Sequence, residues 1–113
     1  MQSTGAHIRN TARSEILRAI AHPIRIAILD ALQGCEMCVG ELADLLLAGQ
    51  PTVSKHLAML RAAGVVEVRR DGNSAYYRLT TQSLPALWGS VEDLLATRHK
   101  SGALALRTPQ SSQ

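Results

Sequence analysis

The fold is decided by residues 39–57, which read VGELADLLLAGQPTVSKHL. Apolar residues recur every three or four positions in the first half of this stretch, and Val53 and Leu57 start a second stripe of the same period. Between the two stripes, Gly49 marks a tight turn, and Pro51 suits the first turn of a helix, where its missing N–H is not needed. The stretch therefore predicts two short helices joined by a tight turn.

After these helices the period of the apolar residues changes to two. Val66 and Val68 alternate with charged residues, and Tyr77 and Leu79 alternate in the same way on the far side of residues 71–73, which read Asp-Gly-Asn. Two alternating runs around a glycine-containing connection predict a β-hairpin. Two helices, a tight turn and a basic hairpin, in this order, are typical of a winged helix-turn-helix.

Three more helices are predicted outside this unit. Helical spacing of apolar residues marks residues 14–21, residues 23–33 and a last segment from Leu84 to about His99. Pro23 separates the first two, because proline disfavours helical geometry in the residue before it. The expected fold class is mainly α with a β-hairpin wing, with four helices before the two strands and one helix after them.

Bulk composition limits the organisation of the chain. Within the 113 residues we expect one DNA-binding and dimerisation domain at 13–98, a flexible arm at 1–12 and a disordered tail at 99–113. No apolar run is long enough to span a membrane, so no membrane partner is expected. Two cysteines are too few for a disulfide framework, which favours a reducing cytoplasm as the compartment.

The distribution of charge favours a binding protein over an enzyme. The net charge is +3, yet residues 30–49 contain four acidic side chains and no Lys or Arg, whereas basic residues dominate residues 50–80. A basic block of this kind favours a polyanionic partner. We find no nucleophile with a matching base and no phosphate-binding loop, and the cysteine pair lies between helices, unlike that of a thioredoxin-like enzyme. We therefore expect no catalytic activity.

Polar side chains gather at the start of the second helix of the central unit, opposite its apolar stripe. A helix fits the major groove of B-DNA, where short polar side chains on its first turns reach base edges. The expected base-contacting residues are Gln50, Thr52, Ser54, Lys55 and His56. The expected phosphate contacts, which add affinity without sequence information, are Arg61, Arg69 and Arg70.

The sequence resembles the ArsR/SmtB family of bacterial metal-sensing repressors over residues 14–95. The strings that carry the resemblance are IAHPIRIAIL (20–29), MCVGEL (37–42), QPTVSKHL (50–57) and YYRL (76–79). The resemblance implies a homodimer that binds an imperfectly palindromic operator in double-stranded DNA, without a cofactor, until an inducer releases it. It also implies that the first and last helices form the dimer interface.

Dimerisation has a physical reason as well. One small winged helix rarely buries enough DNA surface for specific binding, and a two-fold dimer doubles that surface. The apolar stripe of the last helix also needs a partner surface, although Trp88 suits an intramolecular core equally well. The expected interface residues are Ile16, Leu87, Trp88, Val91, Leu94 and Leu95.

Cys35 and Cys38 are the only cysteines, and they form a C-x-x-C just before the central unit. On a helix, residues three apart share a face, so both sulfurs could bind one soft ion or oxidise together. Arsenic-responsive members of the family have Leu-Cys-Val-Cys-Asp-Leu-Cys here, whereas this chain reads MCVGELA at residues 37–43. Only Cys38 matches that pattern, so this segment alone does not supply three thiolates for arsenite.

Four roles for the cysteine pair stay open. The favoured one is release of DNA by arsenite or antimonite, held by two thiolates and a third group. The second is a disulfide or persulfide switch. The third is a Zn²⁺ or Cd²⁺ site completed by a nearby His or carboxylate, for which His22 and His7, from the N-terminal arm of either subunit, are candidates. The fourth is simple packing as small apolar side chains.

Other histidines and carboxylates fit no metal site. The second metal site of the family, on the last helix, needs an Asp-x-His followed by a His-x-x-Glu, and Glu92, Asp93 and His99 lack this spacing. His22 and His56 are isolated in the sequence, and we expect each to cap a helix or face DNA.

Overall fold

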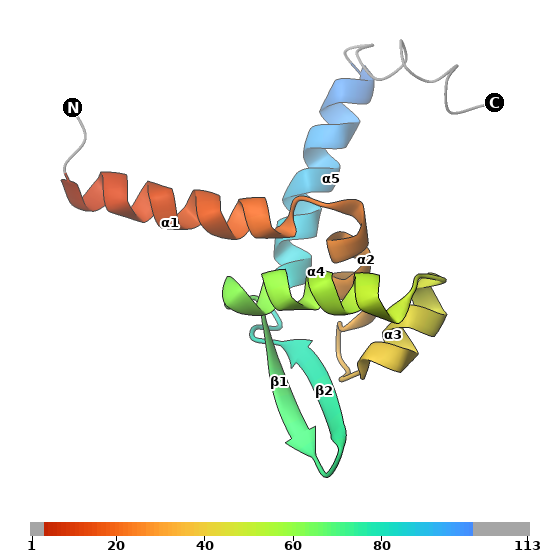
Figure 1. Cartoon of the computed structure of the whole chain (residues 1–113). Helices are drawn as coiled ribbons and strands as arrows, with labels where there is room; N and C mark the ends of the chain where they lie inside the picture. The colour runs from red at the N-terminus through yellow and green to blue at the C-terminus, as the bar shows by residue number, and fades with distance from the viewer. Residues whose placement is uncertain (1–3, 101–113) are drawn as a thin grey trace. The chain divides into compact units, whose positions relative to one another are not determined.

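The computed structural model describes residues 4–100, apart from the side chain of His99. This part of the chain divides between Thr81 and Gln82 into two compact units, within the region predicted as one domain. The elements of the first unit are α1 (Thr4–Ile20), α2 (Pro23–Ala31), α3 (Val39–Leu46), α4 (Gln50–Ala62), β1 (Val66–Asp71) and β2 (Ser74–Leu79), and the second unit contains α5 (Leu84–Lys100) (Figure 1). The predicted order of helices and strands is confirmed.

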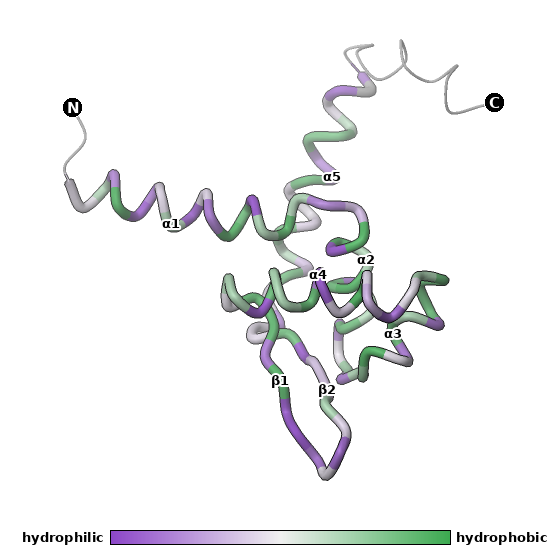
Figure 2. Tube along the Cα trace, viewed as in Figure 1, coloured by the Kyte–Doolittle hydropathy of each residue, from purple (hydrophilic) through white to green (hydrophobic). Residues whose placement is uncertain are grey.

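The core of the first unit lies where α2, α3 and α4 meet. Their inward side chains are aliphatic, and Leu29, Leu42 and Leu57 are completely buried, one from each helix. Figure 2 shows hydrophobic residues recurring along these three helices. Burial of one such side chain stabilises a fold by about 1.5–3 kcal/mol, so the three-helix core fixes the position of α4.

Helix α1 begins at Thr4, ten residues before the predicted start at Ser14. The expected flexible arm at residues 1–12 is therefore helical from Thr4 onward, and residues 1–3 lie outside the described part. Side-chain bonds within the helix, such as Thr11 Oγ1 to the carbonyl oxygen of His7 at 3.0 Å, accompany this extension. Only Ile20 of α1 is buried, and apolar periodicity reveals a helix only where one face is buried.

Helix α2 starts as the sequence indicates. His22 is its N-cap, and its Nδ1 accepts a hydrogen bond of 3.1 Å from the backbone N–H of Ile24. Pro23 occupies the first turn. Of the two roles offered for His22, the cap is confirmed.

Strands β1 and β2 form the predicted antiparallel hairpin. Val66 pairs with Leu79 at its base and Asp71 with Ser74 at its tip, which leaves a two-residue connection. Gly72 opens that connection with φ of +62°, a conformation that suits glycine and a tight hairpin turn. The hairpin, called the wing below, therefore has a tight turn at its tip. Its base is held by the buried side chains of Val66 and Leu79.

Helix α5 extends to Lys100, slightly past the predicted end near His99. The rest of the expected tail, residues 101–113, lies outside the described residues. Among the residues described, no helix combines the length and the hydrophobicity that crossing a membrane requires.

Candidate nucleic-acid interface and cysteine linker

The turn between α3 and α4 sets the direction of α4. Leu47 ends α3 in the left-handed conformation, with φ of +53°, and its side chain is 93% exposed. The N–H of Ala48 then donates a hydrogen bond of 3.0 Å to the carbonyl oxygen of Ala43. Gly49 is the N-cap of α4 and Pro51 lies in its first turn, as the sequence predicts.

Helix α4 presents a polar face opposite a buried one. Gln50, Thr52, Ser54 and Lys55 are all exposed on its first turns, whereas Val53, Leu57 and Leu60 are completely buried. Four of the five predicted base-contacting side chains therefore share a free surface on one helix.

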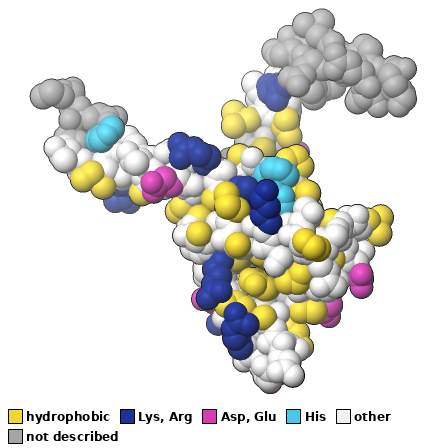
Figure 3. All heavy atoms as spheres, in the orientation of Figure 1, with side chains coloured by type: hydrophobic (Ala, Val, Ile, Leu, Met, Phe, Trp, Pro, Cys, Tyr) yellow, Lys and Arg dark blue, Asp and Glu magenta, His cyan; other side chains and the backbone are white. Residues whose placement is uncertain are grey.

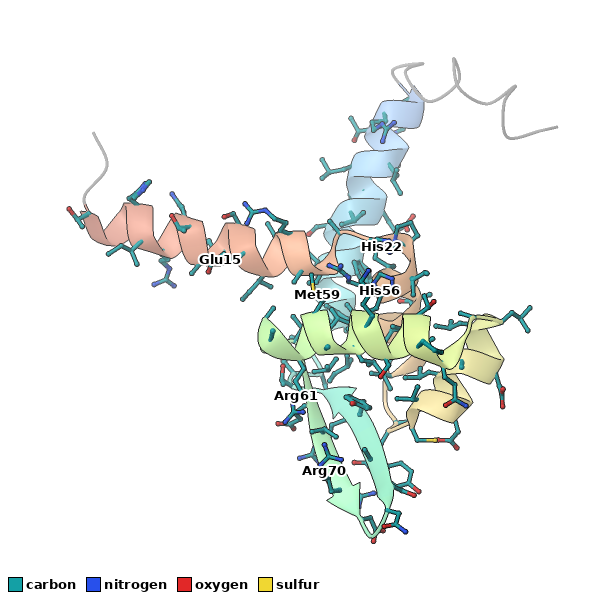
Figure 4. All side chains as sticks on the ribbon, viewed as in Figure 1. Glu15, His22, His56, Met59, Arg61 and Arg70 are labelled. Atoms are coloured by element: carbon teal, nitrogen blue, oxygen red, sulfur yellow. The ribbon has the colours of Figure 1, made fainter. Side chains whose placement is uncertain are left out.

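His56 is the exception, and the expectation that it faces DNA is wrong. It is 8% exposed and lies on the buried edge of α4. Its ring centroid is 4.4 Å from that of His22, and its Nδ1 accepts a hydrogen bond of 3.1 Å from Nε of Arg25. Figure 4 shows the two labelled imidazoles facing each other between α2 and α4. The spacing Val53, His56, Leu57 already places this residue on the apolar stripe.

Burial sets the protonation of His56. It lowers the pKa of the imidazole, and the nearby positive charges of His22, Arg25 and Lys55 lower it further. Because Nδ1 accepts the bond from Arg25, the neutral ring is the form that fits this position. His56 therefore joins α4 to α2 as a hydrogen-bond acceptor.

Two of the predicted phosphate-binding arginines lie open on the same side as α4. Arg61 projects from the last turn of α4 and Arg70 from β1, and both are exposed. Figure 3 shows Lys and Arg side chains on this face, and Figure 4 labels Arg61 and Arg70 on it. Helix α4, called the recognition helix below, and the wing therefore present exposed basic side chains on one surface.

Arg69 is exposed but pairs with Glu36 in the free chain, and its contact with a phosphate stays a prediction. Its Nη2 lies 2.7 Å from Oε1 of Glu36, and its Nε lies 3.1 Å from both carboxylate oxygens. Its guanidinium also lies 5.0 Å from the centroid of the Tyr76 ring. The hydrogen bonds with Glu36 raise the pKa of Arg69, and the same bonds lower the pKa of Glu36. The sequence gives no sign of this pair, because its members are 33 residues apart.

The two cysteines lie in a non-helical linker between α2 and α3, so the expectation that they share one helical face is wrong. Gly34, with φ of +76°, turns the chain away from α2 before Cys35. Cys35 is exposed, and its thiol donates to the carbonyl oxygen of Ala31 at 3.1 Å. Cys38 is the half-buried N-cap of α3.

Carboxylates near the linker already have partners. The backbone N–H of Cys38 donates to Oε1 of Glu41 at 3.0 Å, which lowers the pKa of Glu41, and the Cys38 thiol lowers it further. No group of three His, Cys, Asp or Glu side chains that could hold a metal ion occurs among residues 4–100 with described side chains. His7 and His22 therefore do not join the cysteines in this arrangement.

The predicted interface residues of α1 and α5 are partly exposed. Ile16 is 46%, Val91 38% and Leu94 66% exposed, and the half-buried members of the set are Leu87, Trp88 and Leu95. The indole Nε1 of Trp88 is buried and, among described residues, has no hydrogen-bond partner. The place of these residues in a dimer interface stays a prediction.

Comparison with known proteins agrees with this architecture. The family model "Bacterial regulatory protein, arsR family" matches residues 22–68. The HTH-type transcriptional repressor SmtB of Mycobacterium tuberculosis is 49% identical over 73 residues, which are 65% of this chain and 54% of that protein. The biofilm growth-associated repressor of Xylella fastidiosa is 34% identical over 87 residues, 77% of this chain and 76% of that protein.

A solved structure gives the same result for the fold. The homodimeric winged helix-turn-helix DNA-binding domain from Mycobacterium bovis superposes with a TM-score of 0.72 at 30% identity, covering 87% of this chain and 90% of that one. The chain is therefore a winged helix-turn-helix protein. It belongs to the arsR family of bacterial regulatory proteins, as the resemblance in the sequence implied. Its match spans only about half the length of the SmtB repressor.

Proposed function

We propose that this protein is a transcriptional repressor that binds operator DNA as a homodimer. The observation that carries the proposal is the exposed polar face on the first turns of α4, held in place by a buried opposite edge. The relatives named above are described as repressors, and the solved neighbour as a homodimeric DNA-binding domain. Together they support the same activity for this chain.

Contacts to DNA divide into two groups. Gln50, Thr52, Ser54 and Lys55 enter the major groove and read bases, where a good contact is worth about 1–3 kcal/mol. Arg61 and Arg70 bind phosphates and position the helix without reading sequence. Two copies related by a two-fold axis then read an imperfect palindrome.

Dimerisation uses the apolar side chains of α1 and α5. Ile16, Val91 and Leu94 are exposed in the single chain, and contact with a second copy removes them from water. Burial of apolar surface yields about 25 cal/mol per Å², so these helices provide much of the energy that holds the two DNA-reading helices at a fixed spacing.

The inducer acts at Cys35 and Cys38. Both thiols are free, and they lie in the linker that leads directly into α3. Arsenite or antimonite is the favoured inducer, bound by the two thiolates and a third group from solution or elsewhere. A disulfide or persulfide is the second candidate, since it needs only the two thiols. Zn²⁺ or Cd²⁺ is the third, and it needs further ligands beside the two sulfurs.

DNA binding is tested by selecting tight binders from a random double-stranded library and measuring their affinity by fluorescence anisotropy. The logarithm of the binding constant is expected to fall linearly with the logarithm of salt concentration, in proportion to the number of phosphates contacted. A flat salt response, or selection of no sequence at all, would contradict the proposal and favour a winged helix that binds proteins.

The sensor is tested separately on the selected DNA. Arsenite, Zn²⁺, Cd²⁺, diamide and polysulfide are each added to the complex, with release followed by gel shift. Cys38→Ser is expected to bind DNA as well as the wild type does and to lose release by the effective compound. Normal release from Cys38→Ser would show that the pair is not the sensor.

A further inference from the structure

Residues 36 and 37, which lie between the two cysteines, are bonded directly to the wing. We infer that these bonds form a clasp, so that a covalent link between Cys35 and Cys38 disturbs the β-hairpin as well as the linker. The linker–wing clasp consists of the Met37–Tyr77 backbone pair and the Glu36–Arg69 ion pair. The consequence for DNA binding rests on the function proposed above, whereas the mechanical coupling does not.

The first part of the clasp is a backbone pair. The N–H of Met37 donates to the carbonyl oxygen of Tyr77 at 3.1 Å, and the N–H of Tyr77 donates to the carbonyl oxygen of Met37 at 2.8 Å. Tyr77 also pairs with Val68 of β1. Strand β2 therefore lies between β1 and the linker, and the middle of the wing cannot move independently of Met37.

The second part is the ion pair of Glu36 with Arg69. The carboxylate contacts the guanidinium through two oxygens, at 2.7 and 3.1 Å, and lies 3.9 Å from Arg78 of β2. Both strands of the wing thus present a cation to the same linker residue. While the clasp is closed, Glu36 neutralises positive charge on the wing, and when it opens Arg69 is free to turn elsewhere.

Joining the sulfurs conflicts with the clasp. Met37 lies in an antiparallel β-bridge and residues 36–38 form no turn, and extended backbone separates successive Cα atoms by about 3.3 Å along its direction. A disulfide, by contrast, needs Cα atoms within about 7 Å of each other. A single arsenic atom bonded to both sulfurs adds only about one bond length to that reach, which is still less than three residues of extended backbone span. A linker that brings residues 35 and 38 together must curl, and a curled linker removes Met37 from its register with Tyr77.

Phenylarsine oxide is a suitable probe, because it condenses with two thiols. Each sulfur forms one bond to arsenic, the arsenic–oxygen bond breaks, and the two thiol protons leave with that oxygen as one water; no electrons are transferred. Modification of both cysteines in one chain is verified by the mass of the intact protein. Cys35→Ser, which cannot form the two-sulfur adduct, is the matched control.

The test is amide hydrogen exchange of the full chain, resolved by NMR. The clasp predicts that the amides of Met37 and Tyr77 exchange at least tenfold faster after modification, while that of Leu29 in the core keeps its rate. Unchanged exchange at Met37 and Tyr77 in fully modified protein would overturn the inference. Cys35→Ser treated in the same way is expected to show no acceleration.

A variant of the clasp supplies a second readout. Glu36→Gln is expected to speed exchange at Tyr77 and the reaction of phenylarsine oxide with the linker, because the ion pair no longer restrains residues 35–38. Glu15→Gln removes an exposed carboxylate from α1, outside the clasp, and should change neither rate. Equal rates in Glu36→Gln and the wild type would count against the clasp.

Operator affinity separates this inference from the proposed sensor. If modification speeds exchange at Tyr77 but leaves DNA affinity intact, the clasp stands and the sensor role fails. If DNA is released with no change at Tyr77, the clasp is wrong and the sensor role stands.

Discussion

At the scale of single residues, His56 shows how a polar side chain can belong to the core of a DNA-binding helix. Its ring lies against His22, and its Nδ1 accepts from Arg25, whose Nη1 in turn donates to the carbonyl oxygen of Ala19 at 3.0 Å. A buried acceptor with a charged donor stabilises a fold only while both partners remain. Protonation of this one imidazole therefore removes a hydrogen bond between α2 and α4.

This dependence predicts a loss of stability in mild acid. Unfolded His56 binds a proton below pH 6.5, its ordinary pKa, whereas burial holds the folded pKa lower. The unfolded state then binds more protons, so the stabilisation is complete above pH 6.5 and declines as pH falls below it. The free energy of unfolding, measured in urea between pH 8 and pH 5.5, should fall more in the wild type than in His56→Gln. His7→Gln should behave like the wild type, and an equal fall in all three proteins would contradict the prediction.

Removal of the same side chain predicts a second effect. His56→Ala removes one of the two acceptors of the half-buried Arg25 guanidinium, which keeps its bond to Ala19, and should cost about 1–3 kcal/mol. His56→Gln offers a carbonyl oxygen to Arg25 and should lose less. Chemical denaturation of both variants at pH 8 measures the difference, and equal losses would show that the Arg25 bond contributes nothing.

At the scale of elements, α4 and the wing make different contacts in the proposed complex with DNA. Side chains of the helix are exposed, while the wing contains one open cation, Arg70, and two that are already paired, Arg69 with Glu36 and Arg78 with Glu67. DNA phosphates must compete with a carboxylate for Arg69, whereas they meet Arg70 directly.

This difference predicts unequal effects of two neighbouring substitutions. Arg70→Ala should reduce the slope of log binding constant against log salt by about two, because the proposed homodimer loses one phosphate contact from each copy. Arg69→Ala should change the slope less, since Glu36 already neutralises that cation. Anisotropy titrations at several salt concentrations measure both slopes, and equal reductions would show that the ion pair opens on DNA.

The recognition helix predicts a loss that depends on sequence. Lys55→Ala should weaken operator binding by about 1–3 kcal/mol and relax specificity at the base it contacts. Arg9→Ala removes an exposed cation from α1 and serves as the control, because it lies outside the proposed DNA-binding face. A loss that is the same on operator and random DNA would place Lys55 at a phosphate.

The elements themselves follow from the sequence wherever one face is buried. The stripes of α2, α3 and α4 and the alternation of the hairpin predict their places, because burial selects apolar residues at the period of each structure. Residues 4–13 of α1 lack a buried face, so their helix leaves no such pattern. The bonds of Glu36 to Arg69 and of Met37 to Tyr77 are invisible for another reason: local patterning does not encode which distant residues meet.

At the scale of the whole molecule, the protein is expected to bind its operator as a dimer. Leu94→Glu on α5 or Ile16→Glu on α1 places a charge in the proposed interface, where an unpaired charge is strongly unfavourable. Each should shift the protein from dimer to monomer in sedimentation and weaken operator binding at least tenfold. Leu45→Glu, an equally exposed position on α3, should remain dimeric, and a dimeric Leu94→Glu would argue against this interface.

The turn before α4 has a consequence for engineering. A leucine in the left-handed region costs about 1–2 kcal/mol, and the fully solvated side chain of Leu47 recovers none of it within one chain. Leu47→Gly relieves that cost, although glycine's greater freedom in the unfolded chain offsets part of the gain. This turn therefore offers a gain in thermostability that leaves unchanged every residue of the proposed DNA-binding face, the cysteine pair and the proposed dimer interface.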